Sequence, residues 1–265
     1  MSDQNENEPD NPPLLTVEEV SKAFGGVQAV RSVSFSLAPG TITGLIGPNG
    51  AGKTTLFNLI TSVFPANSGK IAFDGTAIHK LRINDLVRRG IARTFQNVEL
   101  FESMTVLENI LVGQHTRMRC GMWGSIFRFP RVRREERQAR ENAMALLSFV
   151  GIDAYADQKS SDLPFGWQRL LELARALAAQ PKLLLLDEPA AGLNITETAQ
   201  LGELIQKIRE QGITILLVEH DMSLTMSVSD KIIVLDQGEK IAEGLPREVQ
   251  DNEAVIKAYL GTTKN

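Results

Sequence analysis

A glycine-rich segment that ends in lysine and threonine is the part of the sequence best suited to chemistry. It reads G-x-x-x-x-G-K-T, and its residues are Gly47, Pro48, Asn49, Gly50, Ala51, Gly52, Lys53, Thr54 and the adjacent Thr55. An apolar run, Thr41–Ile46, precedes it, and a second, Thr55–Ile60, follows it, so we expect a strand, a tight turn and a helix. Backbone N–H groups in such a turn, together with the positive end of the helix, bind phosphate oxygens.

Two side chains of this segment complete a nucleotide site. Lys53 can reach the β- and γ-phosphates, and the Thr54 hydroxyl can ligate Mg²⁺. A glycine turn that lies beside a lysine by chance is the alternative, and the strand–turn–helix setting argues against it. The segment therefore predicts binding of a nucleoside triphosphate with Mg²⁺.

An acidic pair lies further along the chain, after the apolar run Leu183–Leu186. Asp187 and Glu188 follow that run directly. Burying two carboxylates there costs free energy, which suggests that they have a function. We expect Asp187 to join the Mg²⁺ shell and Glu188 to orient or deprotonate an attacking water. A strand that ends in a solvated acidic turn is common, so the pair alone leaves both interpretations open.

Two more polar residues follow predicted strands. His220 comes after Ile213–Val218, and Gln96 ends the run Ile91–Phe95. Either residue alone is more typical of an ordinary surface or core position. Carboxyl ends of parallel strands meet at one edge of a sheet, so the order lysine, glutamine, acidic pair, histidine indicates an active site. Gln96 would then help to ligate the metal or the water.

The sequence pattern that must position these residues falls into three blocks. Short segments with glycine and proline turns predict strands up to about residue 78, among them Leu14–Val20, Gln28–Leu37 and Lys70–Phe73. Helical apolar spacing dominates the middle block, in Glu102–Val112 and Arg133–Val150. The third block has apolar strands separated by helices, with strands expected at Lys182–Leu186, Ile213–Val218 and Lys231–Leu235.

Continuous apolar strands that alternate with helices predict an α/β fold with a parallel sheet covered on both faces. We expect residues 14–96 and 163–261 to form this core, and residues 97–162 to form an inserted helical subdomain. Residues 1–13 and 262–265 are expected to be tails.

Composition excludes several function classes. The 265 residues are 43% hydrophobic and 23% charged, as in ordinary globular domains, and the net charge of −4 predicts no binding of nucleic acid. The single cysteine, Cys120, excludes an internal disulfide. No apolar run reaches the roughly 18 to 20 residues that span a bilayer, and we expect no signal peptide at the polar N-terminus.

The segment before the acidic strand resembles the signature motif of ATP-binding cassette (ABC) proteins, L-S-G-G-Q-Q-R. Four residues match it: Leu163, Gly166, Gln168 and Arg169. Three depart from it: Pro164, Phe165 and Trp167. The motif presents a helix N-terminus to a γ-phosphate held by a partner subunit, and backbone donors survive these changes, whereas the serine hydroxyl is lost at Pro164.

With these motifs, the chain resembles the ATPase subunits of ABC transporters over nearly its whole length. The resemblance implies a P-loop NTPase core, an N-terminal antiparallel β subdomain and an inserted α-helical subdomain. It also implies that Phe24 stacks on the adenine, that Pro164–Trp167 cap the partner's nucleotide, and that Asn194 stands where the D-loop usually has an aspartate. On its own, Phe24 would be more typical of core packing.

Within that family, the pattern is similar to the larger ATPase subunit of bacterial branched-chain amino-acid importers. The stretches that carry the similarity are Arg93–Asn97, Leu100–Phe101, Met104–Asn109, Gly113–His115, Glu188–Asn194, Glu219–Met222 and Ala258–Gly261. The insertion around residues 117–137 fits this group better than urea importers or lipopolysaccharide exporters. Whether its aromatic and arginine residues touch lipid or pack on the helical subdomain stays open.

This resemblance implies ATP and Mg²⁺ as cofactors, and ATP-driven closure of two subunits as the mechanism, with Glu188, His220 and Gln96 as catalytic residues. It implies transmembrane permease subunits, a second ATPase subunit that is a paralogue or an identical copy, and a solute-binding protein on the other side of the membrane. The chain would lie on the cytoplasmic face of the inner membrane. A different ABC transporter, a soluble cassette ATPase and a non-catalytic P-loop scaffold are the alternatives, and the last would be expected to lack Glu188 or His220.

Overall fold

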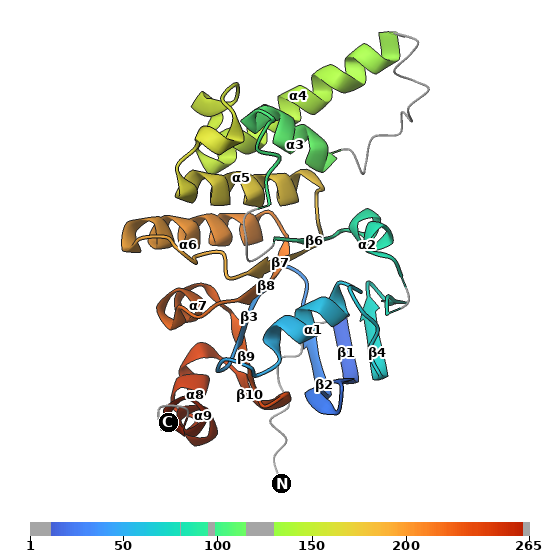
Figure 1. Ribbon diagram of the computed structural model, residues 1–265, viewed down its shortest axis with the longest axis vertical. Helices are drawn as coiled ribbons and strands as arrows, with labels where there is room; N and C mark the ends of the chain where they lie inside the picture. Colours follow the sequence, from blue (N-terminus) through green and yellow to red (C-terminus); the bar gives the residue numbers. More distant parts are fainter. Residues whose placement is uncertain (1–11, 80, 95–98, 115–129, 262–265) are drawn as a thin grey trace. The chain divides into compact units, whose positions relative to one another are not determined.

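The computed structural model describes residues 12–79, 81–94, 99–114 and 130–261, and Figure 1 labels most of their helices and strands. The chain divides into two compact units. The first comprises the residues up to 81, residues 208–215 and the residues from 229 onward. The second comprises residues 82–207 and 216–228.

An antiparallel sheet forms the beginning of the first unit. Its strands, in the order β2-β1-β4-β5, are Val27–Leu37, Leu15–Phe24, Ser68–Phe73 and Thr76–Ala77. Val33, Phe35 and Leu37 alternate with more exposed residues along β2, so one face of the strand is buried. This sheet is the antiparallel β subdomain that the family resemblance implied.

The rest of the first unit carries a parallel strand pair and three helices. Strand β3 (Ile42–Ile46) runs parallel to β9 (Lys231–Asp236), and β10 (Glu239–Gly244) pairs antiparallel with β9. Every residue of β3 is buried, as expected for a strand covered on both faces. The helices are α1 (Lys53–Ile60), α8 (Pro246–Gln250) and α9 (Glu253–Gly261).

The second unit has its own parallel strands. Strand β6 (Ile91–Arg93) pairs parallel with β7 (Leu183–Asp187), and β7 lies next to the end of β8 (Thr214–Val218). Its helices include α2 (Ile83–Arg89), most of α6 (Ile195–Glu210), and α7 (Met222–Val228). The buried strands predicted at 182–186 and 213–218 are confirmed by β7 and β8.

Three helices of the second unit pack side by side: α3 (Val106–Gln114), α4 (Pro130–Val150) and α5 (Phe165–Ala178) (Figure 1). Two short 3-10 helices, Asp153–Tyr155 and Ser160–Asp162, join α4 to α5. Helices α3 and α4 lie within the range predicted for the inserted subdomain. In the described part of the chain, no helix has the length and apolar character that a membrane crossing requires.

The first of these helices starts later than its apolar spacing predicts. A start at Glu102 was expected, and α3 begins at Val106. Thr105 Oγ1 accepts a hydrogen bond from the Glu108 N–H (3.2 Å), and Glu108 Oε2 accepts one from the Thr105 N–H (2.8 Å). This reciprocal capping box fixes the start of the helix. Hydrogen bonding of the Glu108 carboxylate to the Thr105 backbone and then to the Thr105 side chain lowers the pKa of Glu108.

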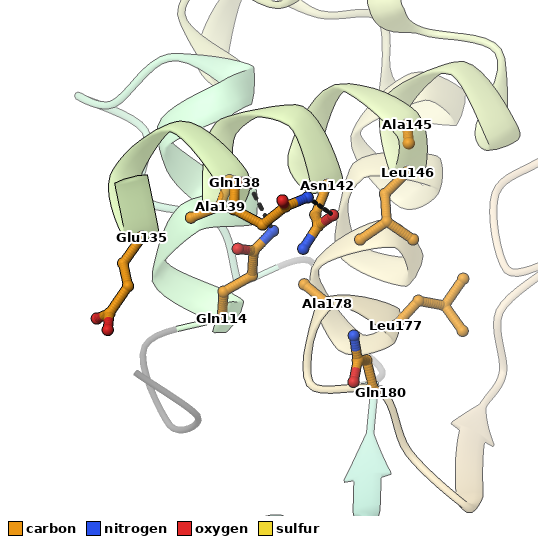
Figure 2. Close-up of a pocket in the computed structure, with 10 residues that line it drawn as sticks. All are labelled: Gln114, Glu135, Gln138, Ala139, Asn142, Ala145, Leu146, Leu177, Ala178 and Gln180. Carbon is orange, nitrogen blue, oxygen red and sulfur yellow. Dashed lines mark hydrogen bonds between the residues drawn. The ribbon is translucent and has the colours of Figure 1, made fainter. Parts of the chain in front are cut away.

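A hollow of about 520 Å³ lies among α3, α4 and α5 (Figure 2). Side-chain amides line part of it: Gln114 Nε2 donates to the Ala139 carbonyl (3.1 Å), and Gln138 Nε2 donates to Asn142 Oδ1 (3.1 Å). Its lining includes none of the residues that the sequence predicts for nucleotide binding or catalysis. The residues predicted for nucleotide binding and catalysis instead lie mainly in loops that follow strands.

Candidate functional site

The predicted phosphate loop joins β3 to α1 in the first unit. Gly47 has a φ of 152°, and a Cβ atom there would lie 2.1 Å from the carbonyl oxygen of Leu235 on β9. Gly52 has a φ of 101°, and a Cβ atom would lie 2.4 Å from the carbonyl oxygen of Ala29 on β2. Only glycine fits at these two positions, because the backbone conformation and the neighbouring main chain both exclude a side chain.

Positive charge is concentrated at this loop. The Lys53 side chain is buried, and its Nζ donates to the carbonyl oxygens of Gly47 (2.6 Å) and Pro48 (3.1 Å). Thr54 is exposed in the first turn of α1, and Thr55 is half-buried. An ammonium group and a helix N-terminus at one loop form an anion site, which is the chemistry that phosphates need.

The C-terminal helix reaches the same loop. The hydroxyl of Tyr259, on α9, is hydrogen-bonded to the Gly47 backbone, which opposes the rise in the pKa of this hydroxyl that burial causes. The sequence singled out Tyr259 only as part of a family pattern. No local periodicity connects two residues so far apart in the chain, so this contact could not be predicted.

Phe24, predicted to stack on the adenine, lies at the end of β1 with 46% of its surface exposed. Its ring meets that of Phe64 edge-on at 5.1 Å, and Lys22 Nζ lies 5.1 Å from its centroid. The core-packing alternative therefore fails, since a core ring would be buried. A partly exposed ring beside a cation has the apolar surface that a planar base requires.

In the second unit, the predicted water-activating pair is in contact. Glu188 Oε1 lies 2.7 Å from His220 Nε2. The Glu188 side chain is 14% exposed and that of His220 is 50% exposed. The Glu188 N–H donates to the carbonyl oxygen of Val218 (2.8 Å), which joins the loop after β7 to the end of β8. The sequence predicted both residues at strand ends, and the strand order brings them together.

Asp187 lies at the end of β7 with its carboxylate almost fully buried. Oδ2 accepts a hydrogen bond from Arg93 Nη2 at 2.7 Å, and the Asp187 N–H donates to Thr94 Oγ1 at 3.4 Å. Arg93 offsets the cost of burying this charge. Both Arg93 and Thr94 were missed as site residues, because only their place in a family pattern was visible in the sequence.

The residues predicted for Mg²⁺ fit that ion by their chemistry. Thr54 offers a hydroxyl oxygen and Asp187 a carboxylate, while Gln96 lies outside the described residues. Among the described residues, no three His, Cys, Asp or Glu side chains gather into a metal cage. Mg²⁺ in nucleotide sites is bound by one or two protein oxygens together with phosphates and water, so a cage is not required.

Glu219 is a buried carboxylate that sequence reasoning passed over. Its Oε1 accepts a hydrogen bond from the Ala190 N–H (2.6 Å), and its Oε2 accepts from the N–H groups of His220 (3.0 Å) and Asp221 (3.5 Å). Burial raises the pKa of the Glu219 carboxyl, the three N–H donors act to lower it, and the Glu188 charge raises it further. The signal available in the sequence was an acidic residue directly before His220 at the end of an apolar strand.

The signature segment begins α5, with Pro164 as the N-cap residue. The two departing aromatic residues have partners within the second unit. A Cβ atom on Gly192 would lie 2.8 Å from Phe165 Cε1, and the Trp167 ring lies 4.3 Å from that of Tyr155. Phe165 and Trp167 therefore contact neighbouring segments of the second unit, while α5 begins as a helix directly after Pro164.

Gly166 and Asn194 meet at the side chain of Glu197. A Cβ atom on Gly166 would lie 2.9 Å from Glu197 Oε1. Glu197 Oε2 accepts from the Asn194 N–H (2.9 Å), and Asn194 Oδ1 accepts from the Glu197 N–H (3.0 Å), which is a capping box at the start of α6. In this structure Asn194 caps a helix, and its predicted contact with a nucleotide stays a prediction.

Two family models match parts of this chain. The family model described as "ABC transporter" matches residues 30–191, and the model described as "Branched-chain amino acid ATP-binding cassette transporter" matches residues 239–264. The second match includes Tyr259 and the helix that carries it.

Similar proteins cover almost the whole chain. The chain is 45% identical over 250 residues to the high-affinity branched-chain amino acid transport ATP-binding protein BraF of Pseudomonas aeruginosa, covering 94% of this chain and 98% of the relative. It is 44% identical, with the same coverage, to LivG of Escherichia coli, which has the same description. Among solved structures, the ADP conformation of MJ1267, an ATP-binding cassette of an ABC transporter, has a TM-score of 0.83 at 32% identity, covering 95% of this chain and 100% of that one.

Proposed function

This chain belongs to the ABC transporter ATP-binding family, and we propose that it is the ATP-hydrolysing subunit of an importer for branched-chain or related amino acids. The observation that carries the solute class is the match of residues 239–264 to a family model specific to branched-chain amino-acid cassettes. The two relatives described above have the same assignment in their names.

Nucleotide binding falls to the first unit in this proposal. The N–H groups of residues 50–55 and the Lys53 ammonium hold the phosphates, and Phe24 stacks on the adenine. Lys53 now donates to two loop carbonyls, and it would exchange these contacts for phosphate oxygens. Such an exchange conserves hydrogen bonds, so the loop can accept the ligand without leaving a buried cation unpaired.

In this proposal, acidic residues help to bind the metal ion and orient the attacking water. Thr54, Asp187 and Gln96 would hold Mg²⁺, which when bound neutralises charge on the phosphates. Glu188 polarises the attacking water, and His220, whose ring contacts Glu188 Oε1, keeps that carboxylate in place and reaches the γ-phosphate. Phosphoryl transfer depends mainly on positioning and charge neutralisation, and these residues would contribute to both.

A partner subunit completes the proposed cycle. Pro164–Trp167 at the start of α5 would cap a nucleotide held by a second ATPase subunit, which is a paralogue or an identical copy. ATP stabilises the closed pair and hydrolysis removes that bias, which moves the permease subunits. In this proposal the chain sits peripherally on the cytoplasmic face of the inner membrane, with a solute-binding protein on the other side.

Expression of the tagged chain in its own host provides the test. Affinity purification of the tagged chain in detergent should bring down two polytopic membrane proteins and one second cassette ATPase. In proteoliposomes with the solute-binding protein, leucine should stimulate ATP hydrolysis severalfold, and urea should not. Stimulation by urea alone, or recovery of ribosomes or DNA in place of membrane proteins, would contradict the proposed function.

A further inference from the structure

We infer that Glu219 is a positioning residue for ATP hydrolysis, because its carboxylate ties together the two loops that carry Glu188 and His220. The inference rests on the proposed ATPase function and adds a residue to its machinery. It assigns Glu219 no contact with ATP or water. Glu219 acts through the backbone of its neighbours.

The geometry of the link is direct. Glu219 lies between the end of β8 and the start of α7 and is 4% exposed. One carboxylate oxygen accepts from Ala190, in the loop that follows Glu188, and the other accepts from His220. A single side chain thus joins the main chains of both loops. Side chains of the same two loops form the contact of 2.7 Å between Glu188 Oε1 and His220 Nε2.

The residue type suits this task. A carboxylate accepts hydrogen bonds at both oxygens and donates none, so it can satisfy buried N–H groups on two sides at once. A glutamine amide has one acceptor oxygen, and its NH₂ group would face an N–H donor on the other side. A buried N–H without an acceptor costs about 1–3 kcal/mol, so the loop with the unsatisfied donor would move.

Glu188 depends on such support because of its own backbone. Its φ is 50°, in the left-handed region that a glutamate rarely adopts. Two backbone N–H groups of this loop donate to the β8 end: the Glu188 N–H to the Val218 carbonyl, and the Ala190 N–H to Glu219. Removing the second loosens the loop directly after the strained residue, so the Glu188 carboxylate would sample positions that do not orient the water.

The test compares Glu219→Gln with Asp230→Asn in the full-length chain. Asp230 is a matched control, since its carboxylate also joins two segments, accepting from the Ile42 N–H (2.8 Å) and from Arg209 Nη1 (2.9 Å), but it belongs to no part of the proposed site. We expect Glu219→Gln to lower kcat for ATP at least tenfold with less than a twofold change in ATP affinity. Asp230→Asn should lower Tm and leave kcat within twofold of wild type.

A double-mutant cycle separates positioning from general damage. If Glu219 acts through the Glu188–His220 pair, Glu219→Gln should lower kcat less than twofold further in a His220→Ala background. Equal losses in both backgrounds would overturn the inference, as would wild-type kcat in the single variant. Absence of ATP hydrolysis by the wild-type chain would instead count against the proposed function. Failure of the inference and failure of the proposed function can therefore be told apart.

Amide hydrogen exchange in the wild-type protein covers the case in which Glu219→Gln does not fold. The Ala190 and His220 amides should exchange at least tenfold more slowly than exposed loop amides, because both donate to a buried carboxylate. Fast exchange at either amide would show that the link is not maintained in solution and would contradict the inference.

Discussion

Lys53 and Glu188 each occupy a position that costs folding free energy. The Lys53 ammonium is buried against loop carbonyls, and Glu188 has a left-handed backbone at φ 50°. A non-glycine residue in that region costs about 1–2 kcal/mol. Strain of this kind persists at functional sites because surrounding contacts hold it, and here the Val218 carbonyl and the His220 ring supply two of them.

Replacing Lys53 by alanine tests the phosphate role of this residue. The variant should bind ATP at least tenfold more weakly, because residues 47–54 lose their cationic side chain while the backbone donors remain. Binding is measured by titration with a fluorescent ATP analogue. Lys207→Ala, at an exposed position on α6, is the control and should bind as wild type does. Wild-type affinity for ATP in Lys53→Ala would contradict the assignment of Lys53 to phosphate binding.

At the scale of single elements, several predictions from the sequence are confirmed for clear physical reasons. The strand, turn and helix around the glycine-rich loop follow from local rules, because an apolar strand, glycines and a helix start are all encoded within about 20 residues. The start of α3 was predicted wrongly, since apolar spacing continues past Glu102 while the Thr105 capping box decides the boundary.

Contacts between distant elements could not be predicted in this way. The bond from Tyr259 to Gly47 and the link from Glu219 to Ala190 depend on tertiary packing. Likewise, Phe165 and Trp167 differ from the signature motif, and their neighbours Gly192 and Tyr155 can be identified only in the structure. The sequence could indicate candidate residues for the chemistry, whereas the residues that hold these candidates in place could be found only in the structure.

The helix cap at α6 leads to a stability prediction. Asn194→Ala should lower the free energy of unfolding by about 1 kcal/mol, because the Glu197 N–H loses its side-chain acceptor. Urea unfolding followed by circular dichroism measures the change. Asn194→Asp keeps an acceptor oxygen at the same position and should unfold as wild type does. Equal destabilisation by both replacements would mean that the cap is not what stabilises this helix.

The β9–β10 hairpin leads to a prediction about pH. Burial alone would raise the pKa of Glu243, but its contacts with Lys231 and Lys240 outweigh burial and lower that pKa below its ordinary value of 4.5. A carboxyl whose folded pKa is lowered contributes stability above its unfolded pKa, and this contribution is lost as the pH falls through the folded pKa. Glu243→Gln should therefore destabilise the protein by about 1 kcal/mol at pH 7, and by progressively less below pH 4.5.

Urea titrations of Glu243→Gln and wild type at pH 7 and at about pH 4 check this. Glu239→Gln, on the same hairpin and with an exposed side chain 3.5 Å from Arg31, is the control and should change stability little at either pH. A destabilisation by Glu243→Gln that is equal at both pH values would show that its cause is packing and not charge.

At the scale of the whole molecule, the residues proposed for nucleotide binding and those proposed for catalysis belong to different compact units. The phosphate loop and Phe24 belong to the first, and the acidic pair, His220 and the signature helix belong to the second.

Phosphate release by the Glu188→Gln variant at saturating Mg²⁺–ATP tests the central claim most directly. Residues of both units are required for turnover if Lys53 holds the nucleotide that Glu188 helps to hydrolyse. The account predicts a loss in kcat of about 10²- to 10⁴-fold, as expected when a general base is removed, with ATP affinity within a few-fold of wild type. An unchanged rate of phosphate release in Glu188→Gln would contradict the account.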